Sequence, residues 1–381
     1  MKYADEYRDA TLARGLAHAI ARAVDPARRY HFMEFCGGHT HAIARYGIED
    51  LLPATVRLIH GPGCPVCVLP VARIDVAIRL ATRPEVTLCT YGDLMRVPGS
   101  GGMSLLRARA GGADVRMVYS TLDAIAIAAA EPAREVVFFA IGFETTAPAT
   151  ALALRRAVRQ GLRNFSVSCN HVLTPAAIQN ILDSPDLRAL DRVQLDGFIG
   201  PAHVSTVIGS QPYEFFAEEF ARPVVIAGFE PLDVLQAVRM LIQQVNDGRS
   251  EVENQYGRAV RREGNPVAKA EVAEFFELRK SFEWRGLGVV PYSGLRLKSG
   301  YAAFDADRRF GIADIPARDN PACECGAILR GSKRPTDCKL FGTVCTPDTP
   351  MGSCMVSSEG ACAAHWTYGR FRDRAARARV A

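Results

Sequence analysis

The sequence lacks the motifs that mark several common classes of protein. It contains no P-loop, and the string Gly61-Pro-Gly-Cys64 lacks the third spaced glycine of a dinucleotide-binding fingerprint. No segment approaches the ~20 uninterrupted apolar residues that a membrane-spanning helix needs. The first six residues are largely polar and do not form the apolar core of a signal peptide. We therefore expect a cytoplasmic protein with no membrane partner.

The sequence also lacks a basic stripe interleaved with aromatic side chains, which is typical of nucleic-acid-binding surfaces. Its 46 Lys and Arg residues exceed its 41 Asp and Glu residues and give a formal net charge of +5, but they are scattered. The one concentration lies at residues 370–379, which contain a single phenylalanine. We interpret this tail as a solvated helix, with an acidic partner surface as the alternative, and expect no nucleic-acid partner.

Cysteine, by contrast, is abundant. The chain has 11 cysteines in 381 residues, and the reducing cytoplasm disfavours a structural disulfide framework. Metal binding or catalysis is the favoured use of these thiols. The remaining composition, with 48% hydrophobic and 23% charged residues, is that of a globular protein of two or three domains.

Eight short apolar runs, separated by glycine-containing turns and helical patterns, extend from about residue 30 to 245. Strands that alternate with helices in this way indicate βαβ units and a parallel sheet. The runs are Tyr30–Phe35, Thr55–His60, Val86–Thr90, Val115–Tyr119, Val136–Ile141, Phe165–Cys169, Gly197–Gly200 and Val224–Ala227.

We interpret this stretch as two α/β lobes that face each other across a cleft. Similar landmarks recur in its two halves and suggest an imperfect duplication; convergent βαβ units are the alternative. Beyond about residue 281 the chain is irregular and rich in Gly, Pro and Cys, so we expect it to fold around a metal centre. The expected segments are an amphipathic N-terminal helix within 1–29, α/β lobes at 30–120 and 121–245, and a helical stretch (Ala268–Arg279) plus an irregular cysteine-rich domain within 246–381.

Soft metal ligands and redox groups follow the first two predicted strands. Cys36 and His39 lie on the turn after the first strand, and Cys64-Pro-Val-Cys67 follows the second. Because parallel strand ends meet at one sheet edge, we expect these groups to share a crevice. A Cys36 thiolate would suit iron(II), and the C-x-x-C spacing favours dithiol redox chemistry or metal ligation. His39 is interpreted as a second ligand, a proton donor or a helix cap, whereas His41 is expected to be structural.

Six cysteines gather between residues 323 and 362. The segment has no C-x-x-C knuckle of the kind that zinc sites use, and dispersed thiols on irregular loops favour an iron–sulfur cluster, which takes four cysteines. The two spare thiols would then form a redox-active pair. A zinc site is the alternative, and six unrelated buried thiols are the least favoured reading. The six are Cys323, Cys325, Cys338, Cys345, Cys354 and Cys362.

Glu144 and His203 follow strands that we assign to the second lobe. A carboxylate and an imidazole that face a metal site can act as acid, base or hydrogen-bonding support for a ligand. Each can equally be a helix cap or a surface residue. Cys89 and Cys169 lie inside apolar runs and are expected to be buried small hydrophobes.

Taken together, these motifs resemble the HypD family of nickel–iron hydrogenase maturation proteins. The similarity covers nearly the whole chain, its motifs are long and peculiar to that family, and no motif cysteine departs from it. The matching strings are Cys36-Gly-Gly-His-Thr-His41, His60-Gly-Pro-Gly-Cys-Pro-Val-Cys67, Gly142-Phe-Glu-Thr-Thr146, Gly200-Pro-Ala-His-Val204, Cys338-Lys-Leu-Phe-Gly-Thr-Val-Cys345 and Met351-Gly-Ser-Cys-Met-Val-Ser-Ser-Glu-Gly-Ala-Cys362.

The resemblance implies a role for each group. Cys36 would hold iron jointly with a partner cysteine, with His39 nearby, and Cys64 and Cys67 would form a redox pair in the same cleft. His203 and Glu359 match further functional positions of the family. The implied 4Fe–4S ligands are Cys323, Cys338, Cys345 and Cys362, with Cys325 and Cys354 as a redox pair beside the cluster.

The resemblance also implies a function: a metallocentre assembly scaffold with a redox step, on which iron receives two cyanides and one carbon monoxide. The implied partners are a small HypC-type chaperone and a HypE-type cyanide donor. From another functional class, the alternative is an iron–sulfur-dependent disulfide reductase that acts through Cys64 and Cys67. A zinc-stabilised structural adaptor is a weaker third hypothesis.

Overall fold

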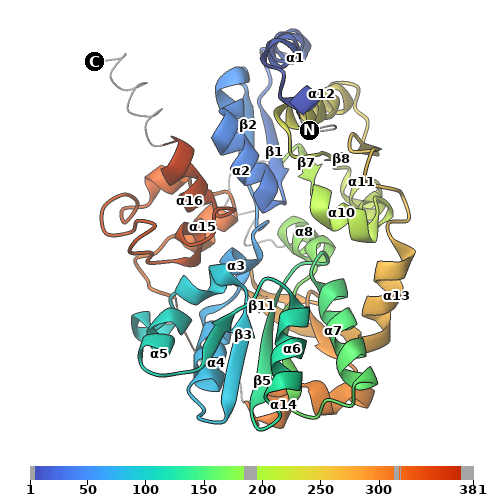
Figure 1. Cartoon of the computed structure of the whole chain (residues 1–381). Helices are drawn as coiled ribbons and strands as arrows, with labels where there is room; N and C mark the ends of the chain where they lie inside the picture. The colour runs from blue at the N-terminus through green and yellow to red at the C-terminus, as the bar shows by residue number, and fades with distance from the viewer. Residues whose placement is uncertain (1–4, 184–194, 313–316, 318, 370–381) are drawn as a thin grey trace.

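Two parallel sheets and a cysteine-rich region make up the fold in the computed structural model (Figure 1). The structure describes residues 5–183, 195–312, 317 and 319–369. The first sheet has the strand order β2-β1-β7-β8-β9, and the second has the order β4-β3-β5-β6. The strands are β1 (Tyr30–Glu34), β2 (Val56–His60), β3 (Val86–Thr90), β4 (Val115–Met117), β5 (Glu135–Gly142), β6 (Phe165–His171), β7 (Gly197–Gly200), β8 (Val224–Ile226) and β9 (Val252–Asn254).

Helices cover both sheets. The first sheet carries α1 (Ala10–Ala23), α2 (Gly37–Tyr46), α10 (Ala202–Ile208), α11 (Glu214–Phe220) and α12 (Pro231–Asn246) in its part of the chain. The second sheet and the connections around it include α3 (Pro65–Val68), α4 (Val71–Ala81), α5 (Leu105–Ala110), α6 (Thr121–Ala130), α7 (Ala147–Arg159), α8 (Thr174–Asp183), α13 (Pro266–Phe275) and α14 (Ala306–Arg309). The amphipathic helix α1 packs on α12 through Ala13 and Ile20.

All eight predicted apolar runs form strands, and the prediction of two parallel sheets with a cysteine-rich region is confirmed. The strands were recognisable because they are buried: every residue of β3 and β6 is inaccessible to solvent or nearly so. Strand β9 was missed, since it has three residues and none is fully buried. The helix predicted over Ala268–Arg279 is wrong at its end, because Phe276–Leu278 leaves the helix as β10 and pairs with β13 (Leu295–Leu297).

The two sheets divide the chain differently from the predicted lobes at 30–120 and 121–245. Strands β1 and β2 pair with each other and, through β1, with β7, where Met33 lies opposite Phe198. The chain builds the whole second sheet, β3 to β6, between these two visits to the first sheet. Apolar periodicity identifies strands but does not say which of them pair. The landmarks of each predicted half therefore could not be assigned to the right sheet, and they are in fact distributed over both sheets.

The cysteine-rich region does not form a core of its own. It contributes the short helices α15 (Cys325–Leu329) and α16 (Ala361–Ala364) and the 3-10 turn η8 (Ser353–Met355). Their apolar side chains join one cluster with the helix α3, which follows β2, and with Trp284 of the hairpin β11 (Ser281–Trp284) and β12 (Gly288–Pro291). In the ranges described, no helix combines the length and apolarity needed to cross a membrane.

A buried ion pair fastens the N-terminal segment to the first sheet. Asp233 is fully buried and accepts hydrogen bonds from Arg258 Nη1 and Gln255 Nε2, each at 2.8 Å. The Arg258 guanidinium also lies 3.9 Å from the ring centroid of Tyr7. Removal of one member of a buried pair leaves the other charge uncompensated, which is strongly destabilising.

We predict that Arg258→Met lowers the free energy of unfolding by about 3 kcal/mol, because Asp233 loses its counter-charge. The matched control is Arg262→Met, which breaks an ion pair whose arginine side chain is 62% exposed and should cost less than about 1 kcal/mol. Urea unfolding curves with unchanged slopes would provide both values. Equal midpoints for the two variants would contradict the prediction.

Candidate functional site

The ends of β1 and β2 bring together the groups that the sequence singled out. Cys36 is the N-cap of α2, and Cys64 is the N-cap of α3. The two turns touch, since Gly37 N–H donates to the Gly63 carbonyl at 2.9 Å. A Cβ at position 63 would lie 2.5 Å from Cys36 N, so only glycine permits this approach. The turns that follow β1 and β2 therefore converge, and we call the place where they meet the Cys36 crevice.

Cys36 lies almost fully buried, with 6% of its surface exposed. Burial is the main cause that raises the pKa of its thiol to about 12, and the Glu359 carboxylate adds to the shift. The backbone N–H groups of Gly38 and His203 hydrogen-bond to the sulfur and lower the pKa, but by less. Without a cation, Cys36 is thus a protonated thiol at neutral pH, yet two N–H donors are already in place for a thiolate.

Glu34 forms a buried network beneath Cys36. Its carboxylate accepts hydrogen bonds from Cys36 N–H at 2.9 Å and from the Thr40 hydroxyl, and it lies 2.9 Å from His60 Nδ1. Burial is the largest single effect and lowers the pKa of His60, but the hydrogen bond to Glu34 and the negative charges of Glu34 and Glu49 together outweigh it, so the net shift is upward. The sequence reading missed this network, although a glutamate at the end of the apolar strand Tyr30–Glu34 was a visible signal.

His39 is fully buried behind Cys36. Its Nε2 lies 3.0 Å from the carbonyl oxygens of both Ala227 and Gly228. Two acceptors require that Nε2 carry the proton, and burial lowers the pKa of the ring, so the imidazole is neutral. Nδ1 is buried and has no hydrogen-bond partner within the described residues. Of the three predicted roles, this tautomer favours a metal ligand, which offers the lone pair of Nδ1, over a proton donor.

His203 and Glu359 reach the same place from other elements. His203 belongs to α10 after β7, which pairs with β1, so it lies on the first sheet and not, as predicted, in a second lobe. The centroid of the Phe229 ring lies 4.3 Å from that of His203 and 5.0 Å from that of His39, and the rings are tilted against each other in both pairs. Glu359 comes from the cysteine-rich region; a Cβ at Gly37 would lie 2.7 Å from its Oε2.

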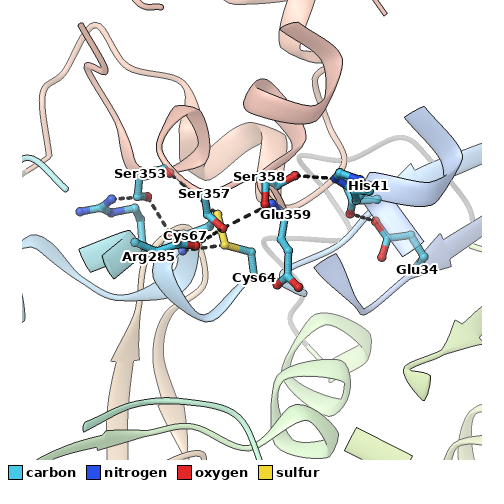
Figure 2. The surroundings of a disulfide bond; sticks show 11 residues. Glu34, His41, Cys64, Cys67, Arg285, Ser353, Ser357, Ser358 and Glu359 are labelled. Atoms are coloured by element: carbon cyan, nitrogen blue, oxygen red, sulfur yellow. Dashed lines mark hydrogen bonds between the residues drawn. A yellow bond between two sulfur atoms is a disulfide. The ribbon is translucent and has the colours of Figure 1, made fainter. Parts of the chain in front are cut away.

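His41 contacts the cysteine-rich region, which fits the structural role expected for it. Its Nδ1 lies 3.3 Å from the Ser358 carbonyl, and its ring meets Tyr368 edge-on. The helix α2 is thereby attached to the cysteine-rich region. Figure 2 shows Glu359 between this contact and the Cys64–Cys67 disulfide, with its side chain directed away from His41.

Cys64 and Cys67 form a disulfide across the first turn of α3. Cys64 is 2% exposed and Cys67 is fully buried. Behind the disulfide, the Ser353 hydroxyl donates to the Cys67 carbonyl at 3.0 Å, and Cys67 Sγ lies 3.9 Å from the Ser353 carbonyl (Figure 2). The next residue is Cys354, so the disulfide lies one residue away from the thiols of the cysteine-rich region.

Five of the six thiols in the cysteine-rich region line one small apolar cavity. They are Cys323, Cys325, Cys338, Cys345 and Cys362. The sixth thiol, Cys354, lies against Cys325 within hydrogen-bond reach. In the part of the chain that the structure describes, no three Cys, His, Asp or Glu side chains are arranged to hold a single metal ion.

The chemistry of this cavity fits an iron–sulfur cluster. Each cysteine of a 4Fe–4S cluster binds a different iron, so its four thiolates surround the cluster and need not converge on one point. Burial and the neighbouring thiols raise the pKa of Cys362 well above its ordinary value. Thiols packed this way become thiolates only when a cationic core balances them. The 4Fe–4S assignment stays a prediction, and the four implied ligands all face the same cavity.

Three other predicted residues lie elsewhere. The Glu144 carboxylate accepts from Thr174 N at 2.8 Å and from the Thr174 hydroxyl at 3.1 Å, so it caps α8. Burial raises the pKa of Glu144 to about 7. Cys89 and Cys169 are buried in the core of the second sheet, as small hydrophobes are expected to be.

We predict that Glu359→Gln lowers the pKa of Cys36, because it removes a nearby negative charge. In metal-free protein at pH 8, iodoacetamide should label Cys36 roughly three to ten times faster in the variant, since one pKa unit is a tenfold change in thiolate. The wild-type rate should rise about tenfold per pH unit from pH 7 to 10, since the pKa is about 12. Peptide mass spectrometry measures both.

Glu324→Gln is the matched control for that experiment, because Glu324 lies in the same region and pairs with Lys333. Its rate of Cys36 labelling should equal that of the wild type. An unchanged rate in Glu359→Gln would show that the carboxylate does not act on the Cys36 thiol.

We predict a pH-dependent stability difference between wild type and Glu144→Gln. The folded-state pKa of about 7 exceeds the ordinary 4.5, so the folded protein retains a proton that the unfolded chain loses. Wild-type stability relative to the variant should therefore fall as pH rises from about 4.5 to 7, by on the order of 3 kcal/mol, and stay constant above. Urea unfolding at pH 4.5, 6 and 8 measures this. A constant difference at all three values would contradict the assigned pKa.

Comparison with known proteins identifies the family of the chain. The family model described as "Hydrogenase formation hypA family" (HypD) matches residues 11–369. A hydrogenase maturation factor HypD of Rhizobium leguminosarum bv. viciae is 75% identical over 374 residues, which cover 98% of this chain and 97% of the relative.

More distant relatives match over the same span. The HypD of Cupriavidus necator is 64% identical, with 98% of each chain covered, and that of Escherichia coli is 48% identical, with 97% of this chain and 98% of the relative covered. Since both the family model and these relatives match nearly the full length, the chain belongs to the HypD family of hydrogenase maturation factors.

Proposed function

We propose that this protein is the scaffold on which the iron of a nickel–iron hydrogenase receives two cyanides and one carbon monoxide. The observation that carries the proposal is the position of Cys36. Its sulfur receives two backbone N–H groups, faces the Glu359 carboxylate and lies on the turn that touches the Cys64–Cys67 disulfide. A metal ligand and a redox pair thus share one buried crevice.

Iron enters this scheme as the substrate, with Cys36 as its protein ligand. Binding displaces the thiol proton, because a cation offsets the burial that keeps Cys36 protonated. Glu359 is placed to accept that proton, and the unpartnered Nδ1 of His39 is the nearby neutral donor. One thiolate leaves several positions open on iron for diatomic ligands and for a cysteine of a small HypC-type chaperone.

The redox pair supplies electrons for cyanide release. A HypE-type donor would deliver cyanide on a sulfur, as R–S–C≡N. Reduced Cys64 and Cys67 give two electrons: the S–CN bond breaks, the Cys64–Cys67 S–S bond forms, and the products are R–SH, one proton and CN⁻, which binds iron. The bonded Cys64–Cys67 pair is the product state of this step.

Reduction of that disulfide requires a route for electrons to Cys67. Ser353 contacts Cys67, and the next residue in the chain is Cys354. Cys354 in turn contacts Cys325. A 4Fe–4S cluster held by Cys323, Cys338, Cys345 and Cys362 would supply single electrons when bound. The pair Cys325 and Cys354 would then stand between the cluster cavity and the pair Cys64 and Cys67.

Burial disfavours the alternative of a general protein disulfide reductase. Cys64 is 2% exposed and Cys67 is inaccessible to solvent. The disulfide of a folded protein substrate could not reach either sulfur without displacement of the cysteine-rich region. A small donor group, or one presented on an extended segment, suits the site better.

We predict infrared bands of iron-bound cyanide and carbon monoxide in the protein purified anaerobically with its small chaperone partner from cells that mature hydrogenase. Cys36→Ala should lose these bands completely, because the iron loses its protein ligand, while iron and acid-labile sulfide of the cysteine-rich region remain. Cys89→Ala is the matched control, since it removes a thiol buried away from the crevice, and should keep the bands.

Any of three results would overturn the proposal. Bands that persist in Cys36→Ala would remove Cys36 as the ligand. A blank spectrum in the wild type, with iron and sulfide at cluster stoichiometry, would favour the disulfide reductase. Zinc in place of iron and sulfide would favour the structural adaptor.

A further inference from the structure

A large pocket outside the Cys36 crevice opens beside the cysteine-rich region. Its volume is about 730 Å³, which is in the range of small-molecule sites. It lies between the loop Gly99–Gly102, the buried Arg285 and the segment that ends at Gly352. None of the groups in the proposed iron chemistry lines it, so it needs another explanation.

The loop Gly99–Gly102 presents bare backbone to the pocket. Gly101 and Gly102 have φ angles of 64° and 73°, a conformation that favours glycine. A Cβ on Gly101 would meet nothing within 4 Å. The loop is held in place from behind, where Asp75 accepts hydrogen bonds from the Ser100 N–H at 2.8 Å and from its hydroxyl at 2.6 Å.

Arg285 supplies a buried positive charge at the inner end. Only 3% of the residue is exposed. Its Nη1 donates to the Ser353 hydroxyl, and its Nε lies 3.1 Å from Asp319 Oδ1 without hydrogen-bond geometry. Its Nη2 is buried and has no partner among the described residues. A guanidinium donor left open in this way is costly, because buried donors are normally satisfied.

The charges around the pocket favour an anion of low charge. Arg96, Arg107 and Arg285 line it together with Asp319 and Asp348, so three positive charges face two negative ones. Arginine forks match the oxygens of phosphate and carboxylate groups. A highly charged polyanion would meet the two aspartates, whereas one oxyanion group on a small organic body would balance the excess.

We propose that this pocket binds a small organic molecule through a single phosphate or carboxylate group, which Arg285 Nη2 holds at the inner end with Arg107 at the rim. The site is placed to communicate with the redox centre. Arg285 N–H donates to the Val68 carbonyl of α3 at 2.7 Å, and its side chain holds Ser353. Gly352 also separates the pocket from Cys323 and Cys325, whose sulfurs would lie within 2.6 Å of a Cβ there.

The experiment is calorimetric titration of the full-length anaerobic protein with inorganic phosphate and, separately, with acetate, at constant ionic strength. We expect saturable one-site binding of at least one anion. Arg285→Met should weaken it about tenfold or more, because a charge-assisted hydrogen bond is lost. Arg107→Met should weaken it by a smaller factor. The anion that binds identifies the oxyanion class.

Arg83→Met is the matched control, because Arg83 stacks on Phe310 and does not line the pocket; its affinity should equal that of the wild type. Absence of saturable binding for both anions would overturn the proposal, as would equal affinities in Arg285→Met and wild type. If Arg285→Met does not fold, the comparison of Arg107→Met with Arg83→Met decides. The result does not depend on whether Cys36 holds iron, because Cys36 does not line this pocket.

Discussion

The site depends on the close approach of two backbone turns, one after β1 and one after β2. Gly37 N–H bonds to the Gly63 carbonyl, and no side chain fits between Gly63 and Cys36. Parallel pairing of β1 with β2 fixes where the turns start, and the missing Cβ fixes how near they come. The close packing of the two backbones, more than attraction between side chains, therefore determines how near the Cys36 thiol lies to the Cys64–Cys67 disulfide.

The cysteine-rich region completes the crevice because it has no core of its own. Its apolar side chains share a cluster with α3, the helix that carries Cys67. That packing brings Glu359 to Cys36 and Ser353 to Cys67 without further elements. The cysteine-rich region folds by packing on α3, and this packing also places Cys325 and Cys354 near Cys64 and Cys67.

The sequence predicted the parts of this structure that depend on local pattern. Buried strands have a continuous apolar signature, and Cys36 and Cys64 follow them directly, so their convergence could be foreseen. Strand partners could not, because periodicity carries no information on pairing; His203 was consequently placed on the wrong sheet. The Glu34–His60 contact joins the ends of two strands 26 residues apart and becomes visible only once β1 and β2 are paired.

Burial and nearby negative charge explain why Cys36 does not ionise readily on its own. Burial raises the pKa of Cys36 to about 12, and the carboxylates of Glu359 and Glu34 add to the shift. Under the proposed function the same carboxylates would favour a metal ion, and the Gly38 and His203 N–H groups, which lower the pKa of Cys36, would stabilise the thiolate. In the proposed function, metal binding and loss of the Cys36 proton would therefore be one coupled event. The buried position of Cys36 thus keeps its thiol protonated, and under the proposed function the thiolate would form as iron binds.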